Sequence, residues 1–257
     1  MMPRLLTGSL VAVTLALAAA TAGAGPANAA DAATTDAPAN ALSVRFTQVT
    51  RTVPVTTGAG AGAGAGFRAP RVTVTGGRAG VGRAIAAAVQ RHENALAATF
   101  AAEAVQAVAD GGSPVQTVFD EVRGTVARSA HYLTIRLDES VNLGGAHPSN
   151  SVHAYVFDAA TGREVTARSL FGAPRRVDRL VRAALIAQTR QVTLTAQDVA
   201  GLSIVPDAHG STAPLSCYPI RAGLHCAVDQ GGVLGYAAGA FEATVTWTAL
   251  SSIRIGG

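Results

Sequence analysis

Six histidines are the side chains of this sequence best suited to acid–base or metal chemistry, and their spacing decides whether they can act together. None of them belongs to an HExxH pair or to another motif with metal-ligand spacing. His147 and His153 flank a predicted turn and could share a metal with Asp158. Nothing in the spacing requires this, because histidines of loops commonly cap, pack or face water. We expect no metal site and no catalytic histidine.

Other motifs that carry enzyme chemistry are also missing from the sequence. There is no Gly-x-Ser-x-Gly nucleophile elbow, and the glycine-rich run 76–82 is a poor dinucleotide fingerprint because Arg78 and Ala79 break its spacing. The adjacent carboxylates Asp138 and Glu139 point to opposite faces of a predicted strand, so they cannot work on one substrate there. We therefore expect a protein that is not an enzyme and binds no cofactor.

Two glycine-rich loops are the better candidates for a functional surface, because binding residues concentrate in loops that a rigid scaffold holds. Glycines allow a positive φ or a close backbone approach, and Pro148 pushes the residue before it toward an extended conformation. The same residues could serve only to make turns. The candidate binding residues in these loops are Gly144, Gly145, His147, Pro148, Tyr236 and Gly239.

The elements that must position these loops follow from hydrophobic periodicity. Apolar residues at spacings of three and four predict a long helix over 79–109 and a shorter one after Pro174. Alternation of apolar and polar residues predicts strands, with a turn at 158–162 between two of them. The strands fall at 42–55, 71–75, 133–138, 151–157, 163–166, 215–219, 224–228 and 241–248. Helices and antiparallel strands in this proportion indicate an α+β domain.

Cys217 and Cys226 are the two cysteines of the chain. They flank a short segment whose Arg221-Ala222-Gly223 is a good hairpin turn. In an oxidising compartment a disulfide is the expected state of such a pair. Metal ligation is the alternative, and it is disfavoured because no second pair accompanies this one.

The N-terminus has the pattern of a secretory signal peptide over 1–29. Arg4 precedes the apolar run 5–20, and Ala27-Asn28-Ala29 is a small-x-small cleavage site. Residues 30–41 are rich in alanine, threonine, aspartate and proline, and we expect a flexible tether. The remainder, 42–257, is expected to form one domain with a glycine-alanine loop at 58–66. The protein should be secreted, with no stable membrane anchor after cleavage.

A formal net charge of +4 is too small to indicate an electrostatic partner. Every basic residue is arginine, which is typical of a GC-rich genome and does not by itself indicate phosphate recognition. No basic stripe with interleaved aromatic residues is present, so nucleic-acid binding is disfavoured.

Two blocks of the sequence resemble a known family. The first is Asn142-Leu-Gly-Gly-Ala-His-Pro148 followed by Tyr155-Val-Phe-Asp158, and the second runs through Tyr236-Ala-Ala-Gly239 to the final strand. Together they are similar to a domain of unknown function in the lysozyme-sensing anti-sigma factor RsiV and in a mycobacterial secreted immunogenic protein. Extensions of some peptidoglycan deacetylases carry similar stretches.

The resemblance implies a β-grasp-like fold, with an antiparallel sheet wrapped around one long helix and a second, shorter helix. It also implies an exported, non-enzymatic binding module that recognises a lysozyme-like protein or a cell-wall component. An anti-sigma role is not expected, because only four residues precede the apolar run. The alternative is a secreted peptidoglycan-directed hydrolase or deacetylase. A further reading is an antigen-like protein whose partner is another cell.

Overall fold

The computed structural model describes residues 41–56, 62–110, 118–144, 147–171, 173–189, 192–205, 213–230, 233–234 and 240–251. All of them belong to the unit Asp36–Gly257. The predicted signal peptide and all but the last residue of the predicted tether lie outside the described residues. No helix among the described ranges is both long and apolar enough to cross a membrane.

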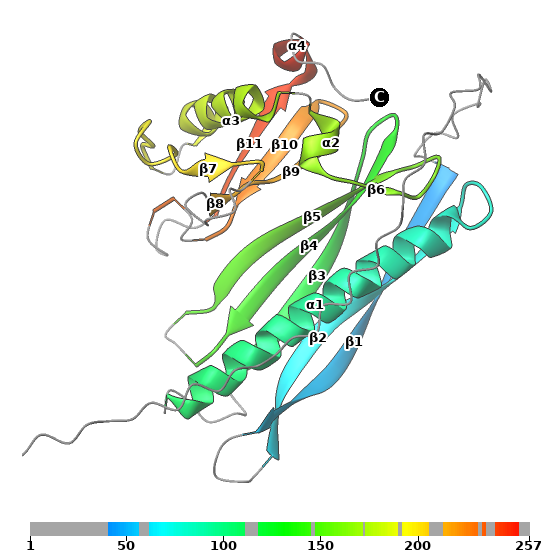
Figure 1. Cartoon of the computed structure of the whole chain (residues 1–257), viewed down its shortest axis with the longest axis vertical. Coiled ribbons are helices and arrows are strands. Elements are labelled where there is room, and N and C mark those ends of the chain that lie inside the picture. Colours follow the sequence, from blue (N-terminus) through cyan, green and yellow to red (C-terminus); the bar gives the residue numbers. More distant parts are fainter. Residues whose placement is uncertain are drawn as a thin grey trace, which may run out of the picture. The chain divides into compact units, whose positions relative to one another are not determined.

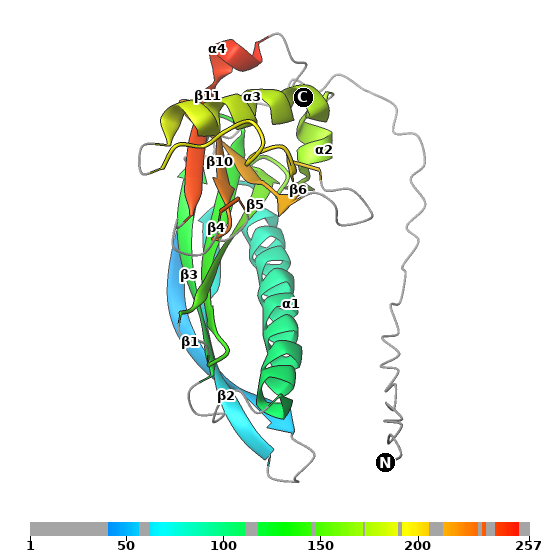
Figure 2. The same ribbon diagram turned by 90° about the vertical axis from the view of Figure 1, so that its left-hand side faces the viewer.

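A six-stranded sheet is the largest element of the fold, and its strands follow one another in chain order (Figure 1). They are β1 (Leu42–Thr56), β2 (Gly62–Gly76), β3 (Phe119–Arg128), β4 (Tyr132–Asn142), β5 (Ser149–Asp158) and β6 (Glu164–Val165). Every neighbouring pair is antiparallel except β2 and β3, which are parallel over Gly66–Arg68 and Phe119–Glu121. The sheet curls (Figure 2), and the amide of Gln48 on β1 donates to the carbonyl of Val122 on β3.

Helix α1 (Val81–Ala109) lies along one face of this sheet, which we call the helix face (Figures 1 and 2). Its buried side chains Ile85, Val89 and Phe100 share a core with residues of β2, β3, β4 and β5. Gly82 allows the first turn to approach β2, because a Cβ there would lie 2.3 Å from the Val74 carbonyl oxygen. This close contact sets the position of the helix on the sheet.

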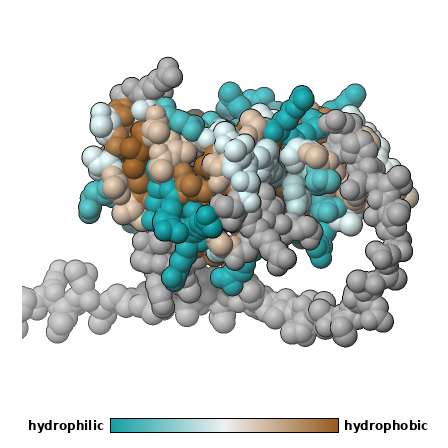
Figure 3. All heavy atoms as spheres, turned by 90° about the horizontal axis from the view of Figure 1, so that it is seen from above, coloured by the Kyte–Doolittle hydropathy of each residue, from teal (hydrophilic) through white to brown (hydrophobic). Residues whose placement is uncertain are grey.

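A second hydrophobic core lies on the other side of the sheet, which we call the open face. A three-stranded sheet of β9 (Ser216–Ile220), β10 (Gly223–Val228) and β11 (Phe241–Thr246) shares this core with Val156 of β5. Helix α3 (Pro174–Gln188) covers it with Val177, Val181 and Leu185. The remaining elements are α2 (Ala167–Leu170), β7 (Leu202–Ser203), β8 (Ala213–Pro214) and α4 (Trp247–Leu250). At the end that carries α3 and α4, apolar side chains gather beside hydrophilic ones (Figure 3).

The disulfide between Cys217 and Cys226 is confirmed. The two residues face each other directly across the antiparallel pair β9–β10. The turn between these strands falls at Arg221 and Ala222, as the sequence predicts. A disulfide of this kind is typical of an oxidising compartment.

The predicted fold, an antiparallel β-grasp-like sheet wrapped around one long helix, is wrong. The fold is mostly sheet, and the six-stranded sheet is mixed and curls into a half-barrel with α1 against one face only. The open face is buried in turn by a second layer of strands and by α3, so the described chain has two cores instead of one. The described residues contain four helices, and the sequence predicts two of them.

Individual elements agree better with the sequence. The helices predicted at 79–109 and after Pro174 are confirmed as α1 and α3, and the turn at 158–162 is confirmed with Gly162 at a φ of 73°. Residues 62–66 of the predicted glycine-alanine loop are part of β2, and the chain after Thr246 is helical. Strand β3 was not predicted at all.

Candidate functional site

A polar groove of about 360 Å³ lies on the part of the open face that the second core leaves uncovered. The strand register places its residues. Arg123 of β3 pairs with Asp138 of β4, which pairs with Val152 of β5. Paired residues of neighbouring strands share a face, so these side chains all border the open face. The lining also includes Glu121, Arg136, Ser140, Asn150 and Ala240, together with Glu139 and Ser151, whose side chains the strand register places on the helix face.

Strand β5 and the segment after β10 are tied together at the end of this groove. The backbone N–H of Gln230 donates to the Asn150 carbonyl at 3.0 Å, and the Asn150 amide donates to the Gln230 side chain. Asp229 Oδ1 accepts from the Val152 N–H at 2.7 Å. These bonds hold the start of β5 beside the chain that leads into 231–239.

Arg136 links the groove to the second core. Its guanidinium donates to Asp138 at 2.8 Å, to the Tyr218 hydroxyl at 3.1 Å and to Glu242 at 2.7 Å. Burial disfavours the charged guanidinium, but these hydrogen bonds outweigh it and raise the Arg136 pKa. A hydrogen bond from His225, together with Arg136, lowers the pKa of Glu242 to about 2. The charged side chains of Arg136 and Glu242 are therefore already ordered in the free protein.

Phe119 extends the same face beyond the groove. It lies two residues before Glu121 on β3, so both side chains are on the open face. Its exposed fraction of 42% makes it one of two large hydrophobic side chains exposed among the described residues. Arg68 of β2 pairs in register with Glu121 and lies 3.6 Å from its carboxylate. An exposed aromatic ring therefore lies next to strands that carry both signs of charge.

Three of the six loop residues predicted to bind are described. Gly144 has a φ of 90°, which confirms that a glycine is required in this β4–β5 connection. His147 is exposed and Pro148 is half-buried immediately before β5. Gly145, Tyr236 and Gly239 lie outside the described residues. Ser140 and Asn150 line the groove, and they belong to the two strands that this β4–β5 connection joins.

A serine, a histidine and a glutamate meet on the helix face. Glu139 Oε2 accepts from Ser151 Oγ at 2.7 Å and lies 2.9 Å from His153 Nε2. The same histidine nitrogen lies 3.3 Å from Ser151 Oγ. A nucleophile–base–acid relay needs the acid and the serine on opposite ring nitrogens. Here both contact Nε2 and the hydroxyl donates to the carboxylate, so the arrangement holds Glu139 and does not activate Ser151.

Asp120 lies diagonally opposite Glu139, because Asp120 pairs with Val141 and Glu139 pairs with Val122. Only 1% of Asp120 is exposed. Burial and the neighbouring Glu139 raise its pKa to about 8. Burial opposes ionisation of Glu139 as well, but hydrogen bonds from His153 and Ser151 lower the Glu139 pKa. At neutral pH the pair therefore carries a proton on Asp120 and a charge on Glu139.

This proton also explains the hydrogen bonding of Asp120. Its side chain shares a hydrogen bond with the carboxyl group of Glu139. A carboxylate can only accept, and its charged neighbour Glu139 can offer no donor. A protonated Asp120 can instead donate to Glu139, so the buried pair is satisfied only in the protonated form.

The metal set considered from the sequence does not assemble. His153 contacts Glu139, whereas Asp158 caps the turn after β5 by accepting from the N–H groups of Ala160 and Thr161. His153 and Asp158 are five residues apart on one strand and point to opposite faces. Within the part of the chain that is described, no group of three or more His, Cys, Asp or Glu side chains could hold a metal ion.

Sequence reasoning missed the residues of β3, which supply Phe119, Glu121 and Arg123 to the open face and Asp120 to the helix face. The available signal was the set Val118, Val122 and Val126, but Asp120 and Gly124 interrupt the alternation that identifies a strand. Asp138 and Glu139 were correctly placed on opposite faces, as the strand pairings require.

Comparisons with known proteins support the fold. No family profile and no curated protein matches the sequence. The structure is similar to the crystal structure of a DUF3298 family member from Bacteroides fragilis, with a TM-score of 0.56, 14% identity and coverage of 85% of this chain and 96% of that chain. A DUF3298 family protein from Pseudomonas aeruginosa gives a TM-score of 0.54 at 13% identity, covering 82% of this chain and 94% of that chain.

At these identities the likeness concerns the fold alone. It supports the predicted resemblance to a domain of unknown function, because both neighbours are described as DUF3298 proteins. The specific links to RsiV and to the mycobacterial secreted protein stay predictions. The described chain thus has a fold that solved DUF3298 proteins also adopt.

Proposed function

We propose that this protein is an exported, non-enzymatic binding module and that its ligand is a lysozyme-like protein held at the open-face groove. The observation that carries the proposal is Phe119, exposed beside a groove of paired charges. Exposed aromatic side chains and arginines are the residues that most often anchor protein–protein interfaces. The signal-peptide pattern and the disulfide support export to an oxidising compartment.

Preorganisation supports binding at this groove. Arg136 is fixed by three hydrogen bonds, and Arg123 Nε lies 3.3 Å from Glu121. Side chains that are ordered in the free protein lose less entropy when a partner binds. The groove carries both arginines and carboxylates at fixed positions. A partner with complementary charges would therefore bind in one defined orientation.

The test is a binding measurement with the purified, oxidised protein immobilised on a sensor. Lysozyme and soluble peptidoglycan fragments are the two analytes. Replacing an anchoring aromatic residue commonly costs about 2 kcal/mol, so Phe119→Ala should weaken lysozyme binding about 30-fold. Ile186→Ala is the matched control, because Ile186 is exposed on α3 and outside the groove.

Several outcomes would contradict the proposal. Binding of neither analyte would refute a module of this kind. Equal weakening by Phe119→Ala and Ile186→Ala would remove the groove from the interface. Binding of peptidoglycan fragments alone, lost in Phe119→Ala, would replace the protein ligand with a wall component.

One observation favours the alternative, a peptidoglycan-directed hydrolase or deacetylase. Asp120 and Glu139 are neighbouring carboxyls whose pKa values are shifted in opposite directions, which is how acid and base roles are divided in many active sites. Against it, Asp120 is 1% exposed and a substrate cannot contact it in this conformation. Release of soluble fragments or acetate from peptidoglycan by the wild type and not by Asp120→Asn would establish the enzyme.

A further inference from the structure

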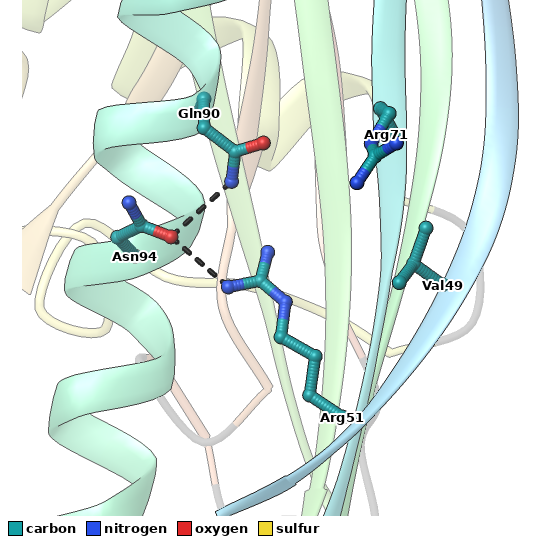
Figure 4. Close-up of a pocket in the computed structure, with 5 residues that line it drawn as sticks. All are labelled: Val49, Arg51, Arg71, Gln90 and Asn94. Atoms are coloured by element: carbon teal, nitrogen blue, oxygen red, sulfur yellow. Dashed lines mark hydrogen bonds between the residues drawn. The ribbon is translucent and has the colours of Figure 1, made fainter.

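A second pocket, of about 330 Å³, lies between α1 and the β1–β2 hairpin. Figure 4 shows its five lining residues. Val49 and Arg51 come from β1, Arg71 comes from β2, and Gln90 and Asn94 come from α1. The volume is at the lower end of the range of small-molecule sites. The pocket is separate from the open-face groove and shares no residue with it.

The polar groups of this pocket are arranged in advance. Asn94 Oδ1 accepts from Arg51 at 3.0 Å and from the Gln90 amide at 3.2 Å, as the dashed lines in Figure 4 show. Because both donors bind Asn94 Oδ1, the orientation of the Asn94 amide is fixed, and its NH₂ group points away from these two donors. The Arg51 guanidinium is further held over the Phe67 ring, 5.8 Å from its centroid.

The charge of the pocket is not balanced. Arg51 lies 4.0 Å from Glu93, the acidic side chain next to the pocket. Within the described part of the chain, no acidic side chain lies within ion-pair distance of Arg71, which is exposed. Two guanidinium groups therefore face at most one carboxylate.

We propose that this pocket binds a small molecule through an oxyanion, a phosphate or carboxylate group held between Arg51 and Arg71. The planar guanidinium presents parallel N–H donors that match the oxygens of both groups. The amides of Gln90 and Asn94 supply further donors and acceptors for the rest of the ligand.

Glu93 makes the site sensitive to pH. Its carboxyl is 1% exposed, and burial raises its pKa to about 7 although Arg51 and Arg71 oppose the shift. The groups that face it are Arg51 of β1, Arg71 of β2, Gln90 of α1 and Tyr155 of β5. As the pH rises through 7, Glu93 becomes charged and competes with a bound anion for the arginines. Binding should weaken accordingly.

The experiment is calorimetric titration of the oxidised protein with inorganic phosphate and, separately, with citrate as a carboxylate probe. Saturable binding of either probe is expected, and binding of one alone identifies the class of oxyanion. Arg71→Gln should weaken binding about tenfold or more, in line with the loss of a charge-assisted hydrogen bond. Arg91→Gln is the matched control, because Arg91 is an exposed arginine of α1 that does not line the pocket.

A second variant checks the role of Glu93. Glu93→Gln removes the competing charge, so the affinity ratio of variant to wild type should increase from pH 6 to pH 8. The ratio cancels the titration of the phosphate itself. Absence of saturable binding by both probes would overturn the proposal, as would equal weakening by Arg71→Gln and Arg91→Gln. Circular dichroism of each variant establishes that the fold is retained.

Discussion

Replacing Asp120 by asparagine should remove much of the pH dependence of this protein's stability. Asp120 is buried, and its pKa is raised from 3.8 to about 8. A raised carboxyl pKa means that the folded state holds a proton which the unfolded state has released. This contribution to stability is complete below about pH 4 and is lost as the pH rises through 8. Asparagine cannot ionise, and its NH₂ group can donate to Glu139 as the protonated acid does.

The magnitude follows from the shift. One proton corresponds to about 1.4 kcal/mol for each pH unit, so between pH 5 and pH 8 the share of Asp120 is at most about 4 kcal/mol. It is an upper limit because Asp120 and Glu139 titrate as a pair. Glu93, with a pKa of about 7, adds to the slope in both proteins and cancels in their difference.

The assay is urea unfolding at pH 5, 6, 7 and 8, followed by far-UV circular dichroism. The unfolding free energy of the wild type should decrease across this range by several kcal/mol more than that of Asp120→Asn. Asp138→Asn is the control, because it makes the same change on the solvent-facing side of the adjacent strand and leaves Asp120 in place. Parallel curves for wild type and Asp120→Asn would refute the assignment of the buried proton to Asp120.

Three other perturbations have defined outcomes. Replacing Cys217 and Cys226 together by alanine should lower the unfolding free energy by about 2–3 kcal/mol, measured by denaturant titration, because a short loop is no longer closed. Arg136→Gln should lower the unfolding free energy by about 2 kcal/mol and raise the pKa of Glu242 from its wild-type value of about 2. Carbon-detected NMR measures this pKa, and an unchanged value would contradict the interaction between Arg136 and Glu242. Gly82→Ala should lower the melting temperature strongly, because the added methyl group would lie 2.3 Å from a β2 carbonyl oxygen; a small effect would mean that α1 can shift.

The elements with strong periodicity could be predicted from the sequence. In α1 and α3 the apolar residues recur every three or four positions, and β4 alternates cleanly through Leu133, Ile135 and Leu137. In these segments the burial of a side chain follows from its place in the repeat. The disulfide was also predictable, because a hairpin turn lies between two cysteines.

Strand β3 could not be found in the same way, and with it most of the candidate site was missed. Its inward positions include Asp120 and Gly124, which break the apolar repeat. Burial beside Glu139 raises the Asp120 pKa and so favours its neutral form inside the sheet. At Gly124 a Cβ would lie 2.4 Å from the Phe46 ring, which favours glycine. Both reasons depend on neighbours that are distant in the chain.

By itself the sequence determined the signal-peptide pattern, the cysteine pair, the two main helices and the loop at Gly144 and Pro148. These depend on residues that are close along the chain. Only the tertiary structure decided that β2 and β3 pair in parallel, that a second core covers part of the open face, and that Arg51 and Arg71 line one pocket with residues of α1. The physical reason is that sheet pairing, burial of a charged group and pocket formation arise from contacts between distant segments, which local periodicity does not encode.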